Sequence, residues 1–174
     1  YYSYDDGSET ELWEYDPDAG TDQKVHDINP LGSSNPNTLI EYQGDGGALY
    51  FKADNGTIEF VYKYDGSSVT VIPSLSNSTW GHFLFRAPTE FDGKLYFINA
   101  NGNQTNSELI EWDGSTVRVI AGMPNWTAAP VGPLGSADGQ TLYTGAISYI
   151  NNRGSELYYW DINSNPNDLT HAAS

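Results

Sequence analysis

A sequence pattern with a period of about 48 residues recurs four times along the chain, and it constrains the fold more than any other feature. Its copies share an aliphatic second residue, an aromatic fifth residue and a final Asp, and these Asp residues are separated by 49, 48 and 48 residues. The four copies are residues 11–16 (ELWEYD), 60–65 (FVYKYD), 108–113 (ELIEWD) and 156–161 (ELYYWD). Each repeat is therefore one structural unit.

Three more short apolar segments accompany each copy, and they are typical of strands rather than helices. A Tyr-rich strand precedes it at residues 1–4, 48–51, 94–97 and 141–143. Another strand follows it at residues 24–28, 69–72, 117–120 and 168–170. A less regular strand comes first in the last three units, at residues 38–42, 83–91 and 131–134. The pattern predicts meanders of four strands, with the first strand of the first unit missing.

Tandem four-stranded units of 40 to 50 residues are typical of β-propeller blades. We therefore predict an all-β, single-domain propeller over residues 1–174, with units of approximately 1–35, 36–80, 81–127 and 128–174. The alternative is a partial propeller that a second chain completes, giving eight units. The predicted core consists of Leu12, Trp13, Tyr50, Phe51, Val61, Tyr62, Tyr96, Phe97, Leu109, Leu142 and Leu157.

Charge and composition exclude several classes of function. With 23 acidic and 7 basic residues, a net charge of -16 repels nucleic acids and anionic membrane surfaces. No apolar stretch is long enough for a membrane helix, so no membrane insertion is expected. The chain has no Cys and three His residues, none at ligand spacing to another, which argues against a zinc site.

The repeated strands resemble those of the bacterial ELWxxDGT, or hyalin-like, repeat proteins. The best match is residues 11–16 followed by 19–21 (AGT) and 25–34, and later copies keep only Asp-Gly-Ser or less of the DGT ending. The chain thus looks like a divergent member of that family. The resemblance implies an extracellular or cell-surface protein of tandem units, and it transfers no catalytic motif.

Asp and Asn residues recur in the turns on both sides of each repeated strand. The final Asp of each copy is expected to accept hydrogen bonds from the following backbone amides, with a metal role as the alternative. The turns before the repeated strands are expected to be hairpin turns that use Asn-Gly and Asp-Gly because these dipeptides accept a positive φ. Their oxygen-rich sequences leave calcium binding open at Asp5, Asp6 and Asp54, although none has the residue pattern of a calcium loop.

Long loops between units supply the candidate ligand-binding residues Trp80, His82 and Trp126. The Trp side chains either stack on a sugar or protein partner, or fill a propeller channel. Four N-glycosylation sequons begin at Asn55, Asn77, Asn103 and Asn125. In a meander these turns all lie on one face, where glycans would keep an extracellular protein soluble.

A non-catalytic structural or adhesive protein that self-assembles head to tail into a fibre or layer is the favoured function. A lectin-like propeller is the first alternative, but its Trp residues do not recur in every unit. A propeller glycoside hydrolase is the second, with Arg86, Glu90 and Arg118 beside His82 as the only candidates for chemistry. We expect no catalytic residues and no cofactor other than calcium. The expected partners are further copies of the chain and glycans.

Overall fold

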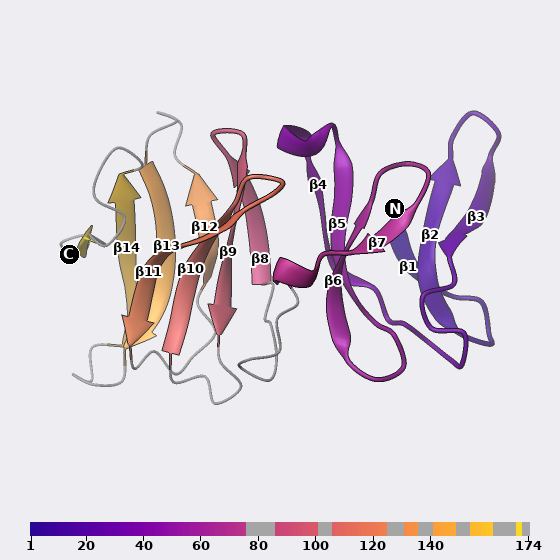
Figure 1. Ribbon diagram of the computed structural model, residues 1–174, viewed down its shortest axis with the longest axis horizontal. Coiled ribbons are helices and arrows are strands. Elements are labelled where there is room, and N and C mark those ends of the chain that lie inside the picture. Colours follow the sequence, from indigo (N-terminus) through magenta and orange to yellow (C-terminus); the bar gives the residue numbers. More distant parts are fainter. Residues whose placement is uncertain are drawn as a thin grey trace. The chain divides into compact units, whose positions relative to one another are not determined.

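The protein forms four antiparallel β-sheets (Figure 1). This computed structural model describes residues 1–75, 86–100, 106–124, 131–135, 141–148, 154–161 and 170–171, with side chains for 1–75, 88–98, 108–120, 141, 143 and 161. Within these ranges there are fifteen strands, two short 3-10 turns and no α-helix. The all-β prediction is confirmed, and the fold is β-propeller-like.

Each sheet is a meander in which neighbours in sequence are neighbours in the sheet. The first sheet contains β1 (Tyr2–Asp5), β2 (Thr10–Asp16) and β3 (Thr21–His26). The second contains β4 (Asn37–Tyr42), β5 (Ala48–Asp54), β6 (Glu59–Tyr64) and β7 (Val69–Val71). The third contains β8 (Arg86–Phe91), β9 (Lys94–Ala100), β10 (Asn106–Trp112) and β11 (Val117–Pro124). The fourth contains β12 (Val131–Gly135), β13 (Thr141–Ser148), β14 (Gly154–Asp161) and β15 (Thr170–His171).

The repeated strands β2, β6, β10 and β14 each pair with the Tyr-rich strand before them in equivalent register. The third residue of the repeat lies opposite an aromatic residue in each of the first three sheets: the pairs are Trp13 with Tyr2, Tyr62 with Phe51, and Ile110 with Phe97. Because successive side chains of a strand point to opposite faces, this register also decides which residues share a face. The repeat therefore presents equivalent positions to equivalent faces in every sheet.

By its contacts the chain divides into two compact units. The first unit comprises Tyr1–Glu41 and Gly47–Ser76, in which one face of the first sheet packs on one face of the second. Its core consists of Leu12, Ile28, Leu49, Phe51, Ala53, Tyr62 and Tyr64, with Val25, Leu39, Phe60 and Val69 packed against it. Tyr50 and Val61, on the other face of the second sheet, are also buried.

One predicted core residue of the first unit is not fully buried. Trp13 is half-buried, because it follows Leu12 in the strand and so points away from the face that meets the second sheet. The prediction that both residues are buried assumed a neighbouring sheet on each side. In the second sheet Tyr50 and Phe51, on opposite faces, are both fully buried, whereas in the first sheet Leu12 is buried and Trp13 is not.

The second unit comprises Tyr42–Gly46 and Asn77–Ser174. Tyr96, Phe97 and Leu109 are buried, as predicted. Tyr42 is also fully buried, and its hydroxyl donates to the carbonyl oxygen of Gly93 at 2.9 Å. The side chains of the remaining predicted core residues, Leu142 and Leu157, lie outside the described side chains.

Four Asx-Gly turns share one geometry, and they explain why Asp and Asn recur. They begin at Asp6, Asn55, Asp65 and Asp113, and in each the side-chain Oδ1 accepts the backbone N–H groups two and three residues later, at 2.7 to 3.1 Å. The glycine of each turn has a φ between +90° and +93°. The expected positive φ thus belongs to the glycine and not to the Asp or Asn.

No helix of the described residues is long and apolar enough to cross a membrane.

Candidate functional site

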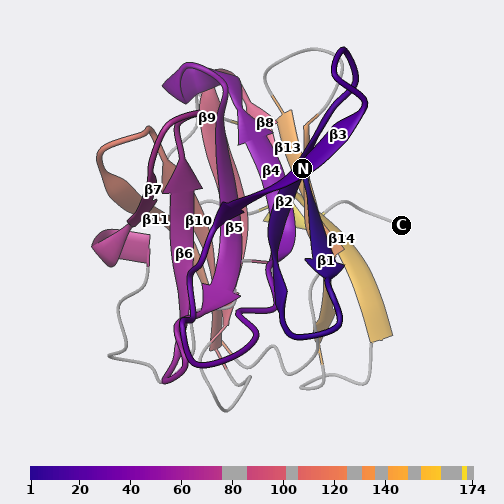
Figure 2. The ribbon, with the colours of Figure 1, turned by 90° about the vertical axis from the view of Figure 1, so that its right-hand side faces the viewer.

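Four aromatic side chains of the first sheet lie on the face that points away from the second sheet. They are Tyr2, Tyr4, Trp13 and Tyr15, here called the outer aromatic face. Figure 2 shows the strands β1, β2 and β3 that carry this face, in indigo. The rings of Tyr4 and Trp13 pack edge to face with 5.2 Å between their centroids, and the rings of Tyr4 and Tyr2 pack edge to face with 6.1 Å between theirs. Tyr4 is 47% exposed and Tyr15 is 54% exposed. The sheet therefore carries an accessible aromatic surface.

Two polar groups of the outer aromatic face have distinct environments. The Tyr2 hydroxyl donates to the Asp22 carboxylate on β3, and this hydrogen bond raises the pKa of Tyr2 to about 12. The Trp13 Nε1 is buried and has no acceptor among the described residues. Leaving a buried donor unmatched costs about 1–3 kcal/mol. Trp13 therefore sits in this face at some cost to stability.

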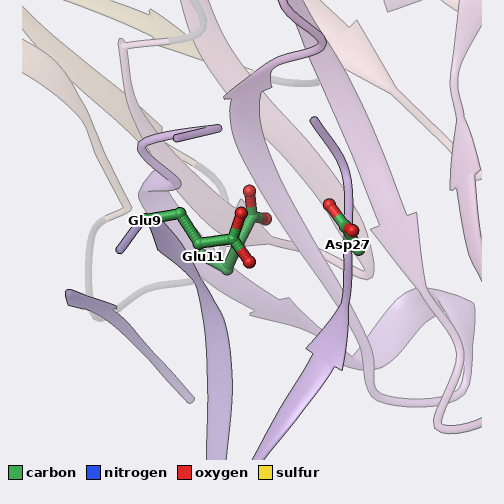
Figure 3. A group of neighbouring side chains, drawn as sticks. All are labelled: Glu9, Glu11 and Asp27. Carbon is green, nitrogen blue, oxygen red and sulfur yellow. The ribbon is translucent and has the colours of Figure 1, made fainter. Parts of the chain in front are cut away.

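Three carboxylates gather at one end of the first sheet (Figure 3). Single oxygen atoms of Glu9, Glu11 and Asp27 lie within 4.8 Å of one another. Glu11 is fully buried, and its oxygens accept from Ser34 Oγ at 2.6 Å, Ser34 N at 3.1 Å and Ile28 N at 3.3 Å. Glu9 forms an ion pair with Lys24, which raises the pKa of Lys24. Protein donors thus already occupy two of the three carboxylates.

A second buried carboxylate, Glu111, lies in the third sheet among cationic and hydroxyl donors. Arg118 donates to it through Nε and Nη2, each at 2.9 Å, and the Tyr96 hydroxyl donates at 2.7 Å. Lys94 Nζ lies 3.2 Å from the same carboxylate. Burial alone would raise the pKa of Glu111, but the hydrogen bonds from Arg118, Tyr96 and Lys94 outweigh it and lower the pKa. Burial and the bond to Glu111 raise the pKa of Tyr96.

These two buried carboxylates were not singled out by sequence reasoning. Glu11 opens the ELW motif and Glu111 is the fourth residue of its copy, positions at which a strand on a sheet surface ordinarily carries a solvated charge. A usable signal existed only for Glu111. Its strand neighbours on both sides carry Tyr96 and Arg118, and such a cross-strand arrangement favours an ion pair.

The predicted calcium-binding residues lie in the turns described above. Asp5 Oδ1 accepts from Gly7 N at 2.9 Å, and Asp54 Oδ1 accepts from Gly56 N at 2.7 Å. Asp6 accepts from the backbone and hydroxyl of Ser8 and from Glu9 N, and the hydroxyl above all lowers its pKa to about 2. Hydrogen bonds within the turns thus engage each of these carboxylates, and calcium binding stays a prediction.

Asn55 is exposed in the turn between β5 and β6, where a sequon was predicted. The other sequon residues, Asn77, Asn103 and Asn125, lie outside the described residues, as do Trp80, His82 and Trp126. Glu90 accepts from the backbone N–H groups of Gln43 and Gly44, at 2.8 and 3.0 Å. Together with the Arg118 pairing to Glu111, this places the enzyme candidates Glu90 and Arg118 in hydrogen bonds with other protein groups.

Comparisons with known proteins bear on the fold alone. No protein-family model matches the chain, and no curated protein matches it. Among solved structures, puromycin hydrolase is similar with a TM-score of 0.61 and 15% identity over 94% of this chain. A mutant of puromycin hydrolase complexed with PGG gives a TM-score of 0.59 and 16% identity over 94% of this chain. The chain spans 28% of the length of each, so what it shares with these hydrolases is the fold of one part.

Proposed function

We propose that this chain is a non-catalytic structural or adhesive module that assembles with further copies of itself. The observation that carries the proposal is the edge strand β1, which among the described residues pairs with β2 alone. In each of the other three sheets a further strand, β4, β8 or β12, pairs with the outer edge of the Tyr-rich strand that precedes the repeated strand. In the described part of the chain no strand occupies that position beside β1.

The sequence of β1 favours pairing with another chain. Sheet edges present unpaired N–H and C=O groups, and proteins commonly block them with Lys, Pro or a bulge. β1 has the sequence YSYD, without Lys or Pro, and its register with β2 is continuous. An added strand would extend the sheet to the four strands of its neighbours.

Assembly of this kind is heterologous, because one surface of a copy meets a different surface of the next. Such contacts propagate into fibres unless the rotation closes a ring. Closure within one chain would give the single four-bladed propeller that the repeat predicts, and closure by a second chain would give the alternative of eight units. The net charge of -16 opposes assembly by repulsion, so added salt should strengthen it.

Sedimentation velocity across a protein concentration series tests the proposal. In 0.5 M salt, where the screening length is roughly 4 to 5 Å, with and without calcium, we expect the mean sedimentation coefficient to rise with concentration. A single monomeric species at every concentration and in both buffers contradicts the proposal.

Structural likeness to two hydrolase structures favours a second candidate, in which the chain is the propeller-like part of a hydrolase. Incubation of the purified chain with puromycin, followed by mass spectrometry, tests this directly. Hydrolysis by the purified chain that is absent from a mock purification would support this candidate, and no hydrolysis above that of the mock purification would contradict it.

A further inference from the structure

The outer aromatic face of the first sheet occupies positions that are buried in the second and third sheets. In the pairing register, Tyr2 corresponds to Phe51 and Phe97, and Trp13 corresponds to Tyr62 and Ile110. Tyr15, the fifth residue of the first repeat, corresponds to Tyr64 and Trp112. The first sheet thus repeats a face whose equivalents lie in the protein core.

The residues at these positions are more exposed in the first sheet than in the second and third sheets. Tyr15 is 54% exposed, whereas Tyr64 is 9% exposed and Trp112 is 3% exposed. The four residues that correspond to Tyr2 and Trp13 are each at most 6% exposed. Large aromatic residues at these positions are what a covered sheet face requires, since they supply its apolar contact area.

In the first unit, the first sheet covers the face of the second sheet that corresponds to the outer aromatic face. There the first sheet packs on the second through Leu12, and Tyr1 meets Tyr64 edge to face with 5.7 Å between ring centroids. Tyr1 stands one residue before Tyr2, at the position that Tyr50 and Tyr96 hold in their own sheets. The covering surface therefore includes Tyr1, just before β1, and Leu12 on the paired strand β2.

The fourth sheet repeats these two positions. Tyr143 on β13 pairs with Tyr159, just as Tyr50 pairs with Lys63 and Tyr96 with Glu111. Leu157 is the second residue of its repeat, as Leu12 is of the first. One chain thus carries both halves of a contact that the first unit already forms between its own two sheets.

We propose that the outer aromatic face binds the fourth sheet of a second copy of this chain, with Tyr143 of that copy against Tyr15. The contact reproduces between copies the packing of Tyr1 on Tyr64 within the first unit. This inference rests on the proposed function. It adds a second contact between copies, through the outer aromatic face, to the strand pairing at the edge of β1. Because the two surfaces differ, each copy offers one to the copy before it and the other to the copy after it.

Cysteine cross-linking tests the predicted pair, and the chain has no native Cys to interfere. One chain carries Tyr15→Cys and a second, mass-tagged chain carries Tyr143→Cys; they are mixed in 0.5 M salt and oxidised with copper phenanthroline. We expect the mixed dimer to exceed both homodimers by at least tenfold. Statistical proportions of the three dimers would overturn the proposed contact.

Lys substitutions on the outer aromatic face provide a second test of the proposed contact. Tyr4→Lys and Tyr15→Lys are made in separate chains, and we expect each to weaken association at least tenfold in a sedimentation concentration series. The matched control is Ile58→Lys, at a residue that is 41% exposed in the turn between β5 and β6 and lies outside both the outer aromatic face and the β1 edge. We expect Ile58→Lys and the ring-retaining Tyr15→Phe to change association less than twofold. Melting curves of all variants verify that they remain folded.

The remaining outcomes separate this inference from the proposed function. If the unaltered chain associates and the Lys variants associate equally well, the face is not the interface while the assembly stands. If the unaltered chain stays monomeric, both fail. If a chain with Cys at both positions cross-links to itself at high dilution, the fourth sheet of the same chain covers the face and the second copy is ruled out.

Discussion

Ser34 Oγ donates a hydrogen bond of 2.6 Å to the carboxylate of Glu11, and both residues are fully buried. Ser34 also connects the two sheets of the first unit, because its carbonyl oxygen accepts from Asp54 N at 2.8 Å while its N–H donates to Thr10 O at 3.0 Å. A buried carboxylate is tolerated here because backbone and hydroxyl donors surround it. This pair joins the loop between β3 and β4 to the strand β2.

Loss of the Glu11 carboxylate should destabilise the first unit. In Glu11→Ala the hydroxyl of Ser34 and the N–H of Ile28 lose their acceptor, and we expect a loss of about 2–4 kcal/mol in the free energy of unfolding. Ser34→Ala should cost about 1–2 kcal/mol. Urea unfolding of both variants and the double variant measures this, and strictly additive losses would show that the two side chains are not coupled.

Acid should weaken the second unit through Glu111. A carboxyl whose pKa is lowered in the folded state stabilises the fold above the unfolded pKa of about 4.3, and that stabilisation is lost as the pH falls through the folded pKa. At pH 7 we expect Glu111→Gln to cost about 1–2 kcal/mol, a modest figure because Arg118 is half exposed. Urea unfolding between pH 7 and pH 2.5 should show the two chains converging at low pH. A constant difference would contradict this account.

The carboxyl of Asp6 should titrate near pH 2. The Ser8 hydroxyl and the amides of Ser8 and Glu9 stabilise its charged form. Carbon-detected NMR of the side-chain carboxyl through a pH series measures the midpoint directly. Ser8→Ala removes the largest contribution, so its midpoint should move upward toward the ordinary Asp value of about 3.9. An unchanged midpoint would show that the hydroxyl is not responsible.

Gly66 should resist substitution because of its backbone conformation alone. Its φ is +90°, and a Cβ there would meet nothing within 4 Å, so any cost of Gly66→Ala comes from the backbone and is expected to be about 1 kcal/mol. The matched control is Gly32→Ala, where φ is not positive and the nearest atom to a Cβ is at 3.9 Å. We expect that control to be neutral or slightly stabilising. Equal melting temperatures for the two variants would contradict the prediction.

Asn55 should carry a glycan in material from the natural source. It is exposed, and it begins an Asn-Gly-Thr sequon in the turn between β5 and β6. Peptide mapping after enzymatic deglycosylation should show conversion of Asn55 to Asp, and the same applies to Asn77, Asn103 and Asn125. Unmodified peptides at all four positions would remove the support that glycosylation lends to an extracellular location.

Local sequence was sufficient to predict the strands and their order. In a meander each strand pairs with its sequence neighbour, so the alternation around Leu12, Val61 and Leu109 and the Asx-Gly turns between strands already specify the pairing. Among the described residues β1 lies at one edge of the first sheet and pairs with β2, which is its neighbour in sequence.

Burial, in contrast, depended on which sheet covers which face, and only the tertiary structure decided that. Trp13 and Tyr62 are the third residues of their repeats, yet Tyr62 packs against the first sheet while Trp13 is half-buried on the outer aromatic face. Glu11 became a core residue because a loop 23 residues away brought Ser34 and its donors to it. A strand pattern records which residues share a face, whereas the free energy of burying that face is set by partners distant in sequence.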